Sequence, residues 1–570
     1  MHSFFFTSAT LLLGVASGAV LNKKADISTV PASAWGDLNN TVQGRLHAEF
    51  PMGAFCFAQY EGALNPHIDL AQCALLEANQ QDTKFMASYA QGYSYSTWPM
   101  CIAKNESCNT QGHILPNPLN PLIGNCQQGS IPNYYIYAEH DGDIQAGLKF
   151  AKKYNIPLVI KASGHDYKGR SAGQGALKIW TANYKFAMQY SQNFQPAGAP
   201  QGMGPAITYN AGHSMEEVLN FADQNGGAVQ AATAMSVRPA GGFLQGGGHS
   251  PLSVSYGLAV DNALEIRGLL PDGTPFIANR QQNSDLFFAL RGGGPGTFGV
   301  VTQSANQLLQ VLIANAEQWA KDGWGGYAFP SLTTNHTSFV VLTTPKLTLA
   351  QAQKSIAPLA DFIATLPQSN VAANILLTYP SYLPVWNETS TIADNLQGGG
   401  VSLSSRLVPV DNFRGAQNQQ SLFNAIAPIM NAFGPLATKP LFMCFTTPYG
   451  YDGGDDAKTS SVTPAWRDSL WHIIALDEWD PNEDEATIEA EFKKTHDVIQ
   501  PLINITPGSG AYQNEADTFE TDPIGAYWGQ DNYNKLLSIK KKYDPSNVLT
   551  CWQCVGWNQA DSRYSCYPDA

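Results

Sequence analysis

One histidine stands in a loop of small residues at the point where a strand is expected to end. The loop runs from Ala162 to Ser171 and follows the strand-like segment Ile156–Ile160. Successive backbone N–H groups in such a loop form a nest that binds an anion such as a diphosphate. His165 places an imidazole beside whatever the diphosphate carries. The pattern favours a nucleotide cofactor with a nucleophile next to it, although a histidine that only hydrogen-bonds a carbonyl fits the loop equally well.

Three further segments extend the pattern. Residues 240–262 are rich in glycine, residues 284–302 contain Arg291-Gly292-Gly293-Gly294, and residues 527–545 begin with Tyr527-Trp528-Gly529. With the histidine loop they resemble, in the same order, the flavin-binding motifs of the FAD-linked oxidases of the vanillyl-alcohol oxidase and berberine-bridge-enzyme type. The resemblance spans roughly residues 126 to 557. It is strongest to fungal secreted members, among them proteins similar to isoamyl alcohol oxidase.

The resemblance implies an α+β fold with a two-part FAD-binding domain of the PCMH type and an inserted substrate domain of antiparallel sheet plus helices. It implies FAD bound covalently through His165 to the 8α-methyl of the flavin. A second bond, to a cysteine, occurs in some members. That position falls near Met235 here, and no cysteine lies between Cys126 and Cys444, so a single bond is expected. The residues expected to bind the cofactor are His165, Ser163, Gly164, Asp166, Gly169, Arg170, Ser171, Gly241, Gly242, Gly246, Gly247, Gly248, Gly257, Gly299, Val300, Val301, Asn532 and Tyr533.

Two residues are the catalytic candidates. Tyr512 begins a segment, Tyr512–Asp517, that resembles the family's Tyr-x-Asn segment on the substrate side of the flavin. Hydride transfer from an alcohol needs a base for the hydroxyl proton, and a tyrosinate stabilised by a neighbouring cation is one. A tyrosine that only packs beneath the flavin is the alternative. His249 follows the glycine run and is expected to orient substrate or tune the flavin, with a structural role equally open.

The expected reaction is hydride transfer from a hydroxyl-bearing small molecule, an alcohol or a sugar, to the flavin, with reoxidation by dioxygen to hydrogen peroxide. A flavin dehydrogenase, an oxidative cyclase of secondary metabolism and a flavin-retaining protein without catalysis remain alternatives.

Two short motifs match those of other enzyme classes, and both are rejected because the secondary structure expected on either side of them is wrong. Gly294-x-Gly296-x-x-Gly299 matches a dinucleotide fingerprint, which needs a strand before it and a helix after it, whereas here a helical pattern precedes and Val300-Val301-Thr302 follows. Gly169-x-Ser171-x-Gly173 matches a nucleophile elbow, but the strand-like Ala176–Trp180 follows it where a helix is required. A serine hydrolase is therefore a minor alternative.

Composition excludes several partners. The chain has 570 residues, is 44% hydrophobic and carries a formal charge of −14. It can bury a large core, and its acidity disfavours nucleic acids and anionic lipid surfaces.

The two ends of the chain indicate secretion. Residues 3–20 are apolar and end in small residues, as in a cleaved signal peptide. There are five Asn-x-Ser/Thr sequons, at Asn39, Asn105, Asn335, Asn387 and Asn504, and nine cysteines gathered near the termini. Structural disulfides are expected, with at least one thiol left over. A redox or metal role for Cys551-Trp552-Gln553-Cys554 and any other metal site are not expected.

The expected division of the chain has five parts. They are a signal peptide (1–19), a cysteine-containing extension (20–125), the FAD-binding domain (126–310), the substrate domain (311–510) and a C-terminal berberine-bridge-like segment that returns to the FAD domain (511–570). In the FAD-binding domain a helix is expected near Ile144–Tyr154, and in the substrate domain strands at Phe339–Leu342 and Leu441–Phe445.

Overall fold

A computed structural model describes residues 24–110, 124–294, 305–330, 339–366, 374–393, 398–433, 440–454, 459–480 and 483–568. The expected signal peptide, the sequon at Asn335 and the expected cofactor residues Gly299, Val300 and Val301 lie outside the described residues. Among the described helices, none is long and apolar enough to cross a membrane.

The first layer is a four-stranded sheet in the N-terminal half. Its strand order is β1-β5-β7-β6, with β1 antiparallel to β5 and the other neighbours parallel. The strands are β1 (Leu46–Ala48), β5 (Tyr134–Tyr137), β6 (Leu158–Lys161) and β7 (Leu177–Trp180). β6 and β7 confirm the strands expected on either side of the histidine loop. The edge strand β1 comes from the cysteine-containing segment, so that segment completes this sheet.

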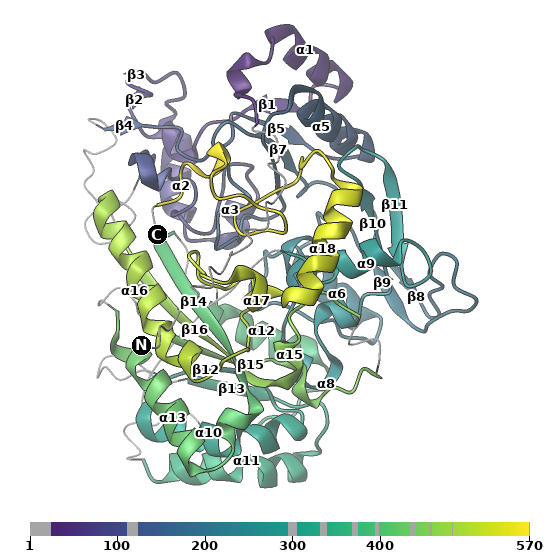
Figure 1. The fold of residues 1–570 in the computed structure, drawn as a ribbon, viewed down its shortest axis with the longest axis vertical. Helices are drawn as coiled ribbons and strands as arrows, with labels where there is room; N and C mark the ends of the chain where they lie inside the picture. The colour runs from purple at the N-terminus through teal and green to yellow at the C-terminus, as the bar shows by residue number, and fades with distance from the viewer. Residues whose placement is uncertain are drawn as a thin grey trace, which may run out of the picture.

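Helices α1 (Ala32–Thr41) and α5 (Asp141–Tyr154) cover this sheet, as Figure 1 shows. α5 confirms the helix expected near Ile144–Tyr154. It packs closely because a Cβ on Gly147 would lie 2.9 Å from the Ile136 side chain. The other α-helices and strands described in this half of the chain are α2 (Leu70–Asn79), α3 (Thr83–Ala87), β2 (Gln59–Tyr60), β3 (Ala63–Leu64), β4 (Asn125–Cys126), β8 (Gln189–Ser191), β9 (Ala206–Thr208), α6 (Met215–Gln224), α7 (Leu244–Gly246), α8 (Ser253–Tyr256), β10 (Glu265–Leu269), β11 (Pro275–Asn279) and α9 (Ser284–Leu290).

The second layer is a five-stranded, fully antiparallel sheet of order β13-β12-β15-β16-β14. Its strands are β12 (Gly325–Phe329), β13 (Phe339–Thr343), β14 (Gly400–Pro409), β15 (Leu441–Phe445) and β16 (Ser469–Trp479). β13 and β15 confirm the two strands expected in the substrate domain, and the sheet with its helices confirms the expected α+β architecture.

Side chains alternate between the two faces of this sheet, as the pleat requires. On one face Met443 and Ile473 join the apolar cluster of helices α10 (Ala305–Lys321), α11 (Leu349–Ala364), α13 (Ala416–Ile426) and α16 (Glu485–Asn504). On the other face Phe442 and Ile474 pack with Phe243 of the glycine-rich segment and with Val237 just before it. The helices therefore back the sheet, and its other face meets the FAD-binding segments.

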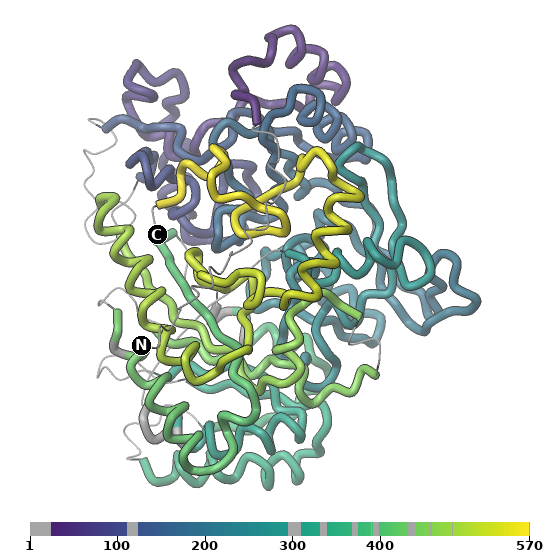
Figure 2. Tube along the Cα trace, in the orientation of Figure 1, coloured from purple at the N-terminus to yellow at the C-terminus, as the bar shows by residue number. Residues whose placement is uncertain are grey.

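The C-terminal segment joins the two layers. Helices α17 (Pro523–Tyr527) and α18 (Gln530–Tyr543), with α12 (Tyr382–Ala393) and α15 (Ala465–Asp468), complete the fold, and α17 and α18 pack on α9. In Figure 2 the yellow C-terminal tube runs across the middle of the molecule, between the blue N-terminal part and the green sheet. This arrangement brings the Tyr512 segment back to the first half of the chain.

The nine cysteines form four disulfides and leave one thiol. The pairs are Cys56–Cys73, Cys101–Cys566, Cys108–Cys126 and Cys551–Cys554, and Cys444 is free and buried. This confirms the expected structural disulfides and the unpaired thiol. Cys551 and Cys554 bond to one another. Asn105, Asn387 and Asn504 of the sequons are exposed, and Asn39 is half-buried.

Candidate active site

The histidine loop is fixed by two glycines at its turns. Gly164 has φ +97° and Gly169 has φ +70°, conformations that residues with a Cβ rarely adopt. A Cβ on Gly164 would also lie 2.8 Å from the carbonyl oxygen of Gly92. The loop can therefore follow β6 closely and carry His165 into the interior.

His165 is buried and electrically neutral. It is 4% exposed, and its Nε2 lies 2.7 Å from Oγ of Ser236. Burial, together with the charges of Lys161 and Arg238, lowers the pKa of His165 to about 3. A neutral imidazole has the lone pair that a nucleophile requires, so the residue is in the right form to bond a cofactor.

Other polar residues of the loop serve the loop itself. The Arg170 guanidinium pairs with the Asp166 carboxylate at 2.6 Å, and the Ser171 carbonyl accepts a hydrogen bond from the Tyr93 hydroxyl. Gly169 and Arg170 also line a cavity with Trp552, and none of His165, His249 and Tyr512 lines it. Ser163 is buried next to Gly164. Asp166 and Arg170 thus pair with each other in this structure, and their contact with the cofactor stays a prediction.

The glycine run lies directly against the Tyr512 segment. A Cβ on Gly246 would come within 1.9 Å of the Asn514 amide, and one on Gly247 within 3.3 Å of the Tyr512 ring. The Gly248 N–H donates to the Tyr512 hydroxyl at 3.2 Å. Gly241 and Gly242 lie in the turn Pro239–Phe243, just before the glycine run. A Cβ on Gly241 would lie 3.3 Å from Ala162 of the histidine loop. The structure therefore brings together three of the sequence segments that the flavin resemblance selects.

Asn514 provides a test of whether a flavin fits here. The residue is fully buried, and neither its Nδ2 nor its Oδ1 makes a hydrogen bond of normal geometry among the described residues, although the amide lies close enough to Tyr512 to lower the pKa of that hydroxyl. Leaving a buried polar atom unpaired costs about 1–3 kcal/mol. A flavin ring offers both donors and acceptors at its edge, so an amide in this position fits the cofactor.

Tyr512 and His249 are neighbours beside the glycine run. Their ring centroids are 5.2 Å apart, and both side chains are buried. Burial, and the nearby Glu515 carboxylate, raise the pKa of Tyr512, whereas burial lowers the pKa of His249 to about 3. In these surroundings Tyr512 keeps its proton, so the tyrosinate expected from sequence would need a positive charge beside it.

Several expected cofactor residues lie in supporting positions. The Asn532 amide donates to the Val462 carbonyl, and the Tyr533 hydroxyl accepts from the Gly556 N–H. Gly257 has φ +79°, and a Cβ there would lie 2.6 Å from the ring of Tyr451. Cofactor binding by these three residues stays a prediction.

Four residues near the site were not assigned a role from sequence. Ser236 contacts His165, Glu515 lies 3.1 Å from Nε2 of His249, and Cys444 and His472 are opposite one another on β15 and β16. Glu515 lies only three residues after Tyr512, and this closeness in sequence to a catalytic candidate could have marked it as a site residue. His472 lies in an otherwise apolar strand, and only the tertiary structure shows its neighbours.

Comparison with known proteins agrees with this geometry. The FAD binding domain family matches residues 132–278, and the berberine and berberine-like family matches residues 511–555. The FAD-linked oxidoreductase ZEB1 of Gibberella zeae is 32% identical over 98% of both chains. The bifunctional decalin synthase calF of Penicillium decumbens is 30% identical over 96% of both chains. The crystal structure of the VAO-type flavoprotein MtVAO713 of Myceliophthora thermophila C1 superposes with a TM-score of 0.78 at 25% identity, covering 94% of this chain and 97% of that one.

Proposed function

Because this chain belongs to the FAD-linked oxidoreductases of the vanillyl-alcohol oxidase and berberine-bridge-like family, we propose that it is a secreted oxidase of hydroxyl-bearing small molecules, alcohols or carbohydrates. FAD, when bound, accepts the hydride from the carbon that bears the hydroxyl. Dioxygen is the proposed final acceptor, which makes hydrogen peroxide the second product. The four disulfides and the exposed sequons support an extracellular location.

One observation carries this proposal. The glycine run, the histidine loop and the Tyr512 segment are far apart in the sequence, yet a Cβ at Gly246 would collide with the buried Asn514, and one at Gly241 would lie 3.3 Å from the half-buried Ala162. Glycines allow a flat ring to lie against the backbone, and the unpaired Asn514 amide is available to its polar edge. His165 is the proposed site of a single covalent bond, since its imidazole is neutral and held by Ser236.

The side chains around the glycine run have two proposed roles, which are to bind and deprotonate the substrate hydroxyl and to exclude water. Tyr512 and His249 are the two groups proposed to hold the substrate hydroxyl and take its proton. The facing side of the five-stranded sheet presents the buried aromatic residues Tyr327, Phe329 and Phe442, which exclude water from the reacting groups.

A second candidate is an oxidative cyclase of secondary metabolism. The observation in its favour is the relative from Penicillium decumbens, which is called a bifunctional decalin synthase and matches over 96% of both chains. Such an enzyme uses the same flavin segments, and its substrate is a biosynthetic intermediate in place of a simple alcohol or sugar.

Acid precipitation of the secreted protein tests the proposal. A yellow pellet from the wild type and a colourless pellet from His165→Ala establish a flavin bonded through His165. Reduction of the bound flavin by an alcohol or sugar under anaerobic conditions, followed by peroxide formation on admitting air, establishes the oxidase. A wild-type protein with no flavin before precipitation contradicts the proposal, and a flavin that dyes reoxidise but dioxygen does not identifies a dehydrogenase.

A further inference from the structure

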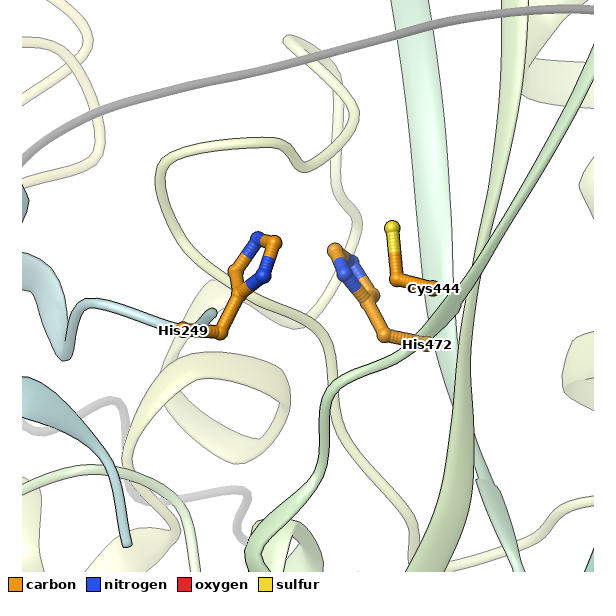
Figure 3. A group of neighbouring side chains, drawn as sticks. All are labelled: His249, Cys444 and His472. Carbon is orange, nitrogen blue, oxygen red and sulfur yellow. The ribbon is translucent and has the colours of Figure 1, made fainter. Parts of the chain in front are cut away.

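Three side chains that can bind a metal converge beside the glycine run. One ligand atom from each of His249, Cys444 and His472 lies within 4.8 Å of those of the other two. In Figure 3 the His472 ring lies between the His249 ring and the Cys444 thiol, and the three side chains extend to the same side. Cys444 on β15 and His472 on β16 are directly opposite in the sheet register, and His249 approaches from the glycine run. The sheet therefore fixes two of the three groups relative to each other.

The polar atoms of these side chains lack the partners that a buried cluster needs. His249 is 2% exposed, and His472 and Cys444 are fully buried. Within the described part of the chain, neither ring nitrogen of His472 has a hydrogen-bond partner, and neither has Nδ1 of His249. Buried polar atoms are paired in the great majority of cases. Among the described residues, the two rings are hydrogen-bonded only through Nε2 of His249, and three ring nitrogens are left unpaired.

Glu515 stands behind the two histidines. Its buried carboxylate lies 3.1 Å from Nε2 of His249 and 3.5 Å from Nδ1 of His472. A carboxylate that accepts from one ring nitrogen of a histidine, leaving the other for a metal, is the common outer support of metal-binding histidines. The remaining nitrogens are Nδ1 of His249 and Nε2 of His472, and both lack a partner among the described residues.

We propose that His249, Cys444 and His472 bind one zinc ion, or a divalent transition metal of similar softness, with Glu515 orienting the two histidines. Two imidazoles and a thiolate are a ligand set that zinc prefers, and zinc bonds of about 2.0–2.3 Å require the three ligand atoms to move closer together than the 4.8 Å within which they now lie. Binding replaces the thiol proton of Cys444 by the metal and releases that proton to solvent. Three protein ligands leave a fourth coordination position for water or another oxygen ligand.

Metal binding can be tested without knowing what the enzyme oxidises, because metal content is measured in the absence of substrate. It bears on the proposed function in one respect. If His249 holds a metal, the hydroxyl proton is left to Tyr512, a consequence that rests on the proposed oxidase activity.

The test measures metal in the secreted holoprotein by mass spectrometry, as purified and after incubation with zinc followed by gel filtration. We expect one zinc per chain in the wild type and loss of at least nine-tenths of it in Cys444→Ala and His472→Ala. Ser405→Ala is the control, because Ser405 is buried opposite Ile474 on the same face and is not a proposed ligand. It should keep one zinc. Glu515→Gln should keep the stoichiometry with affinity weaker by about 10–100-fold.

Replacing zinc by cobalt provides a second measurement, which needs only the wild-type protein. Cobalt bound through a thiolate in a tetrahedral site gives red-region bands, which lie outside the absorption of oxidised flavin. A zinc-loaded wild type with no metal after gel filtration overturns the proposal, as does cobalt binding without these bands or full metal in a folded Cys444→Ala variant. A colourless protein with one zinc leaves the metal site standing and contradicts the flavin function, and a yellow protein without metal does the reverse.

Discussion

Nε2 of His165 and Oγ of Ser236 lie 2.7 Å apart in the protein interior, although 71 residues separate them in the chain. His165 belongs to the loop after β6, and Ser236 precedes the glycine-rich turn that begins at Pro239. The hydrogen bond joins two flavin segments and sets the plane of the imidazole. Since Nε2 is engaged with the serine, Nδ1 is the nitrogen that we propose for the flavin bond.

Removing the serine hydroxyl should slow covalent attachment of the flavin. In Ser236→Ala we expect attachment to be slower by about tenfold, the equivalent of about 1.4 kcal/mol for one lost hydrogen bond. The measurement is the yellow colour in the acid pellet compared with the supernatant, followed over time after adding FAD to flavin-free protein. Ser236→Thr should restore the rate. Thr233→Val, which changes another buried hydroxyl nearby, should match the wild type. Wild-type attachment in Ser236→Ala would show that the hydrogen bond has no part in the reaction.

Changing the two side chains beside the glycine run should separate proton transfer from cofactor binding. In Tyr512→Phe we expect the rate of flavin reduction by substrate to fall by about 10²–10⁴-fold, as when a positioned acid or base is lost. The covalent flavin should remain, because His165 is untouched. Anaerobic stopped-flow reduction measures the step. A large loss in His249→Gln with near-normal Tyr512→Phe would transfer the role to His249, and normal rates in both would exclude the pair.

The segments expected to bind the cofactor could be predicted because their glycines occur where the backbone turns sharply or approaches another segment closely. Gly164 lies at a turn with positive φ, and Gly246 lies where a Cβ would collide with Asn514. In the sequence both positions stand out as glycines within the motifs. Two strands of the substrate sheet were likewise predictable, since β13 and β15 are apolar runs and β13 also contains β-branched residues, whereas the antiparallel arrangement was implied by the family resemblance.

The partners of individual polar residues could not be predicted in the same way. Asp166 and Arg170 are charged loop residues beside an expected cofactor, yet they pair with each other. His472 alternates with Trp471 and Ile473 along β16, and the sequence does not say that its face meets His249. Such contacts depend on which sheet face meets which loop, and this is settled only by tertiary packing.

The stability of the C-terminal segment should depend on the charge of His496. Its Nδ1 lies 2.5 Å from the Asp517 carboxylate, and this hydrogen bond, together with the charge of Asp517, raises the pKa of His496 above its ordinary value of 6.5. A raised pKa in the folded state means stabilisation that is full below the unfolded pKa and is lost as the pH rises through the folded one. The stability difference between wild type and His496→Gln should therefore be largest in acid and decline above neutrality.

The effect on the free energy of unfolding should be less than about 1 kcal/mol, because the pair is partly exposed. Denaturant unfolding at several pH values between about 5 and 8, where histidine titrates, provides the measurement. Lys84→Gln breaks an exposed pair with Glu216, which has no part in the charge of His496, and should give a difference that does not change over this range. A difference for His496→Gln that grows with pH would contradict the assignment.

The Cys101–Cys566 disulfide should be the cross-link on which the folded chain depends most. It joins residues 465 positions apart and ties the N-terminal segment to the C-terminal segment, whereas Cys551–Cys554 spans only three positions. A cross-link that closes a long loop removes more freedom from the unfolded chain than one that closes a short loop. Replacing both Cys101 and Cys566 by alanine should cost about 2–5 kcal/mol. Thermal inactivation without reductant, compared with the Cys551→Ala/Cys554→Ala variant, measures the difference. Equal losses in the two variants would mean that local packing around each sulfur pair, and not the length of the closed loop, determines what each cross-link contributes.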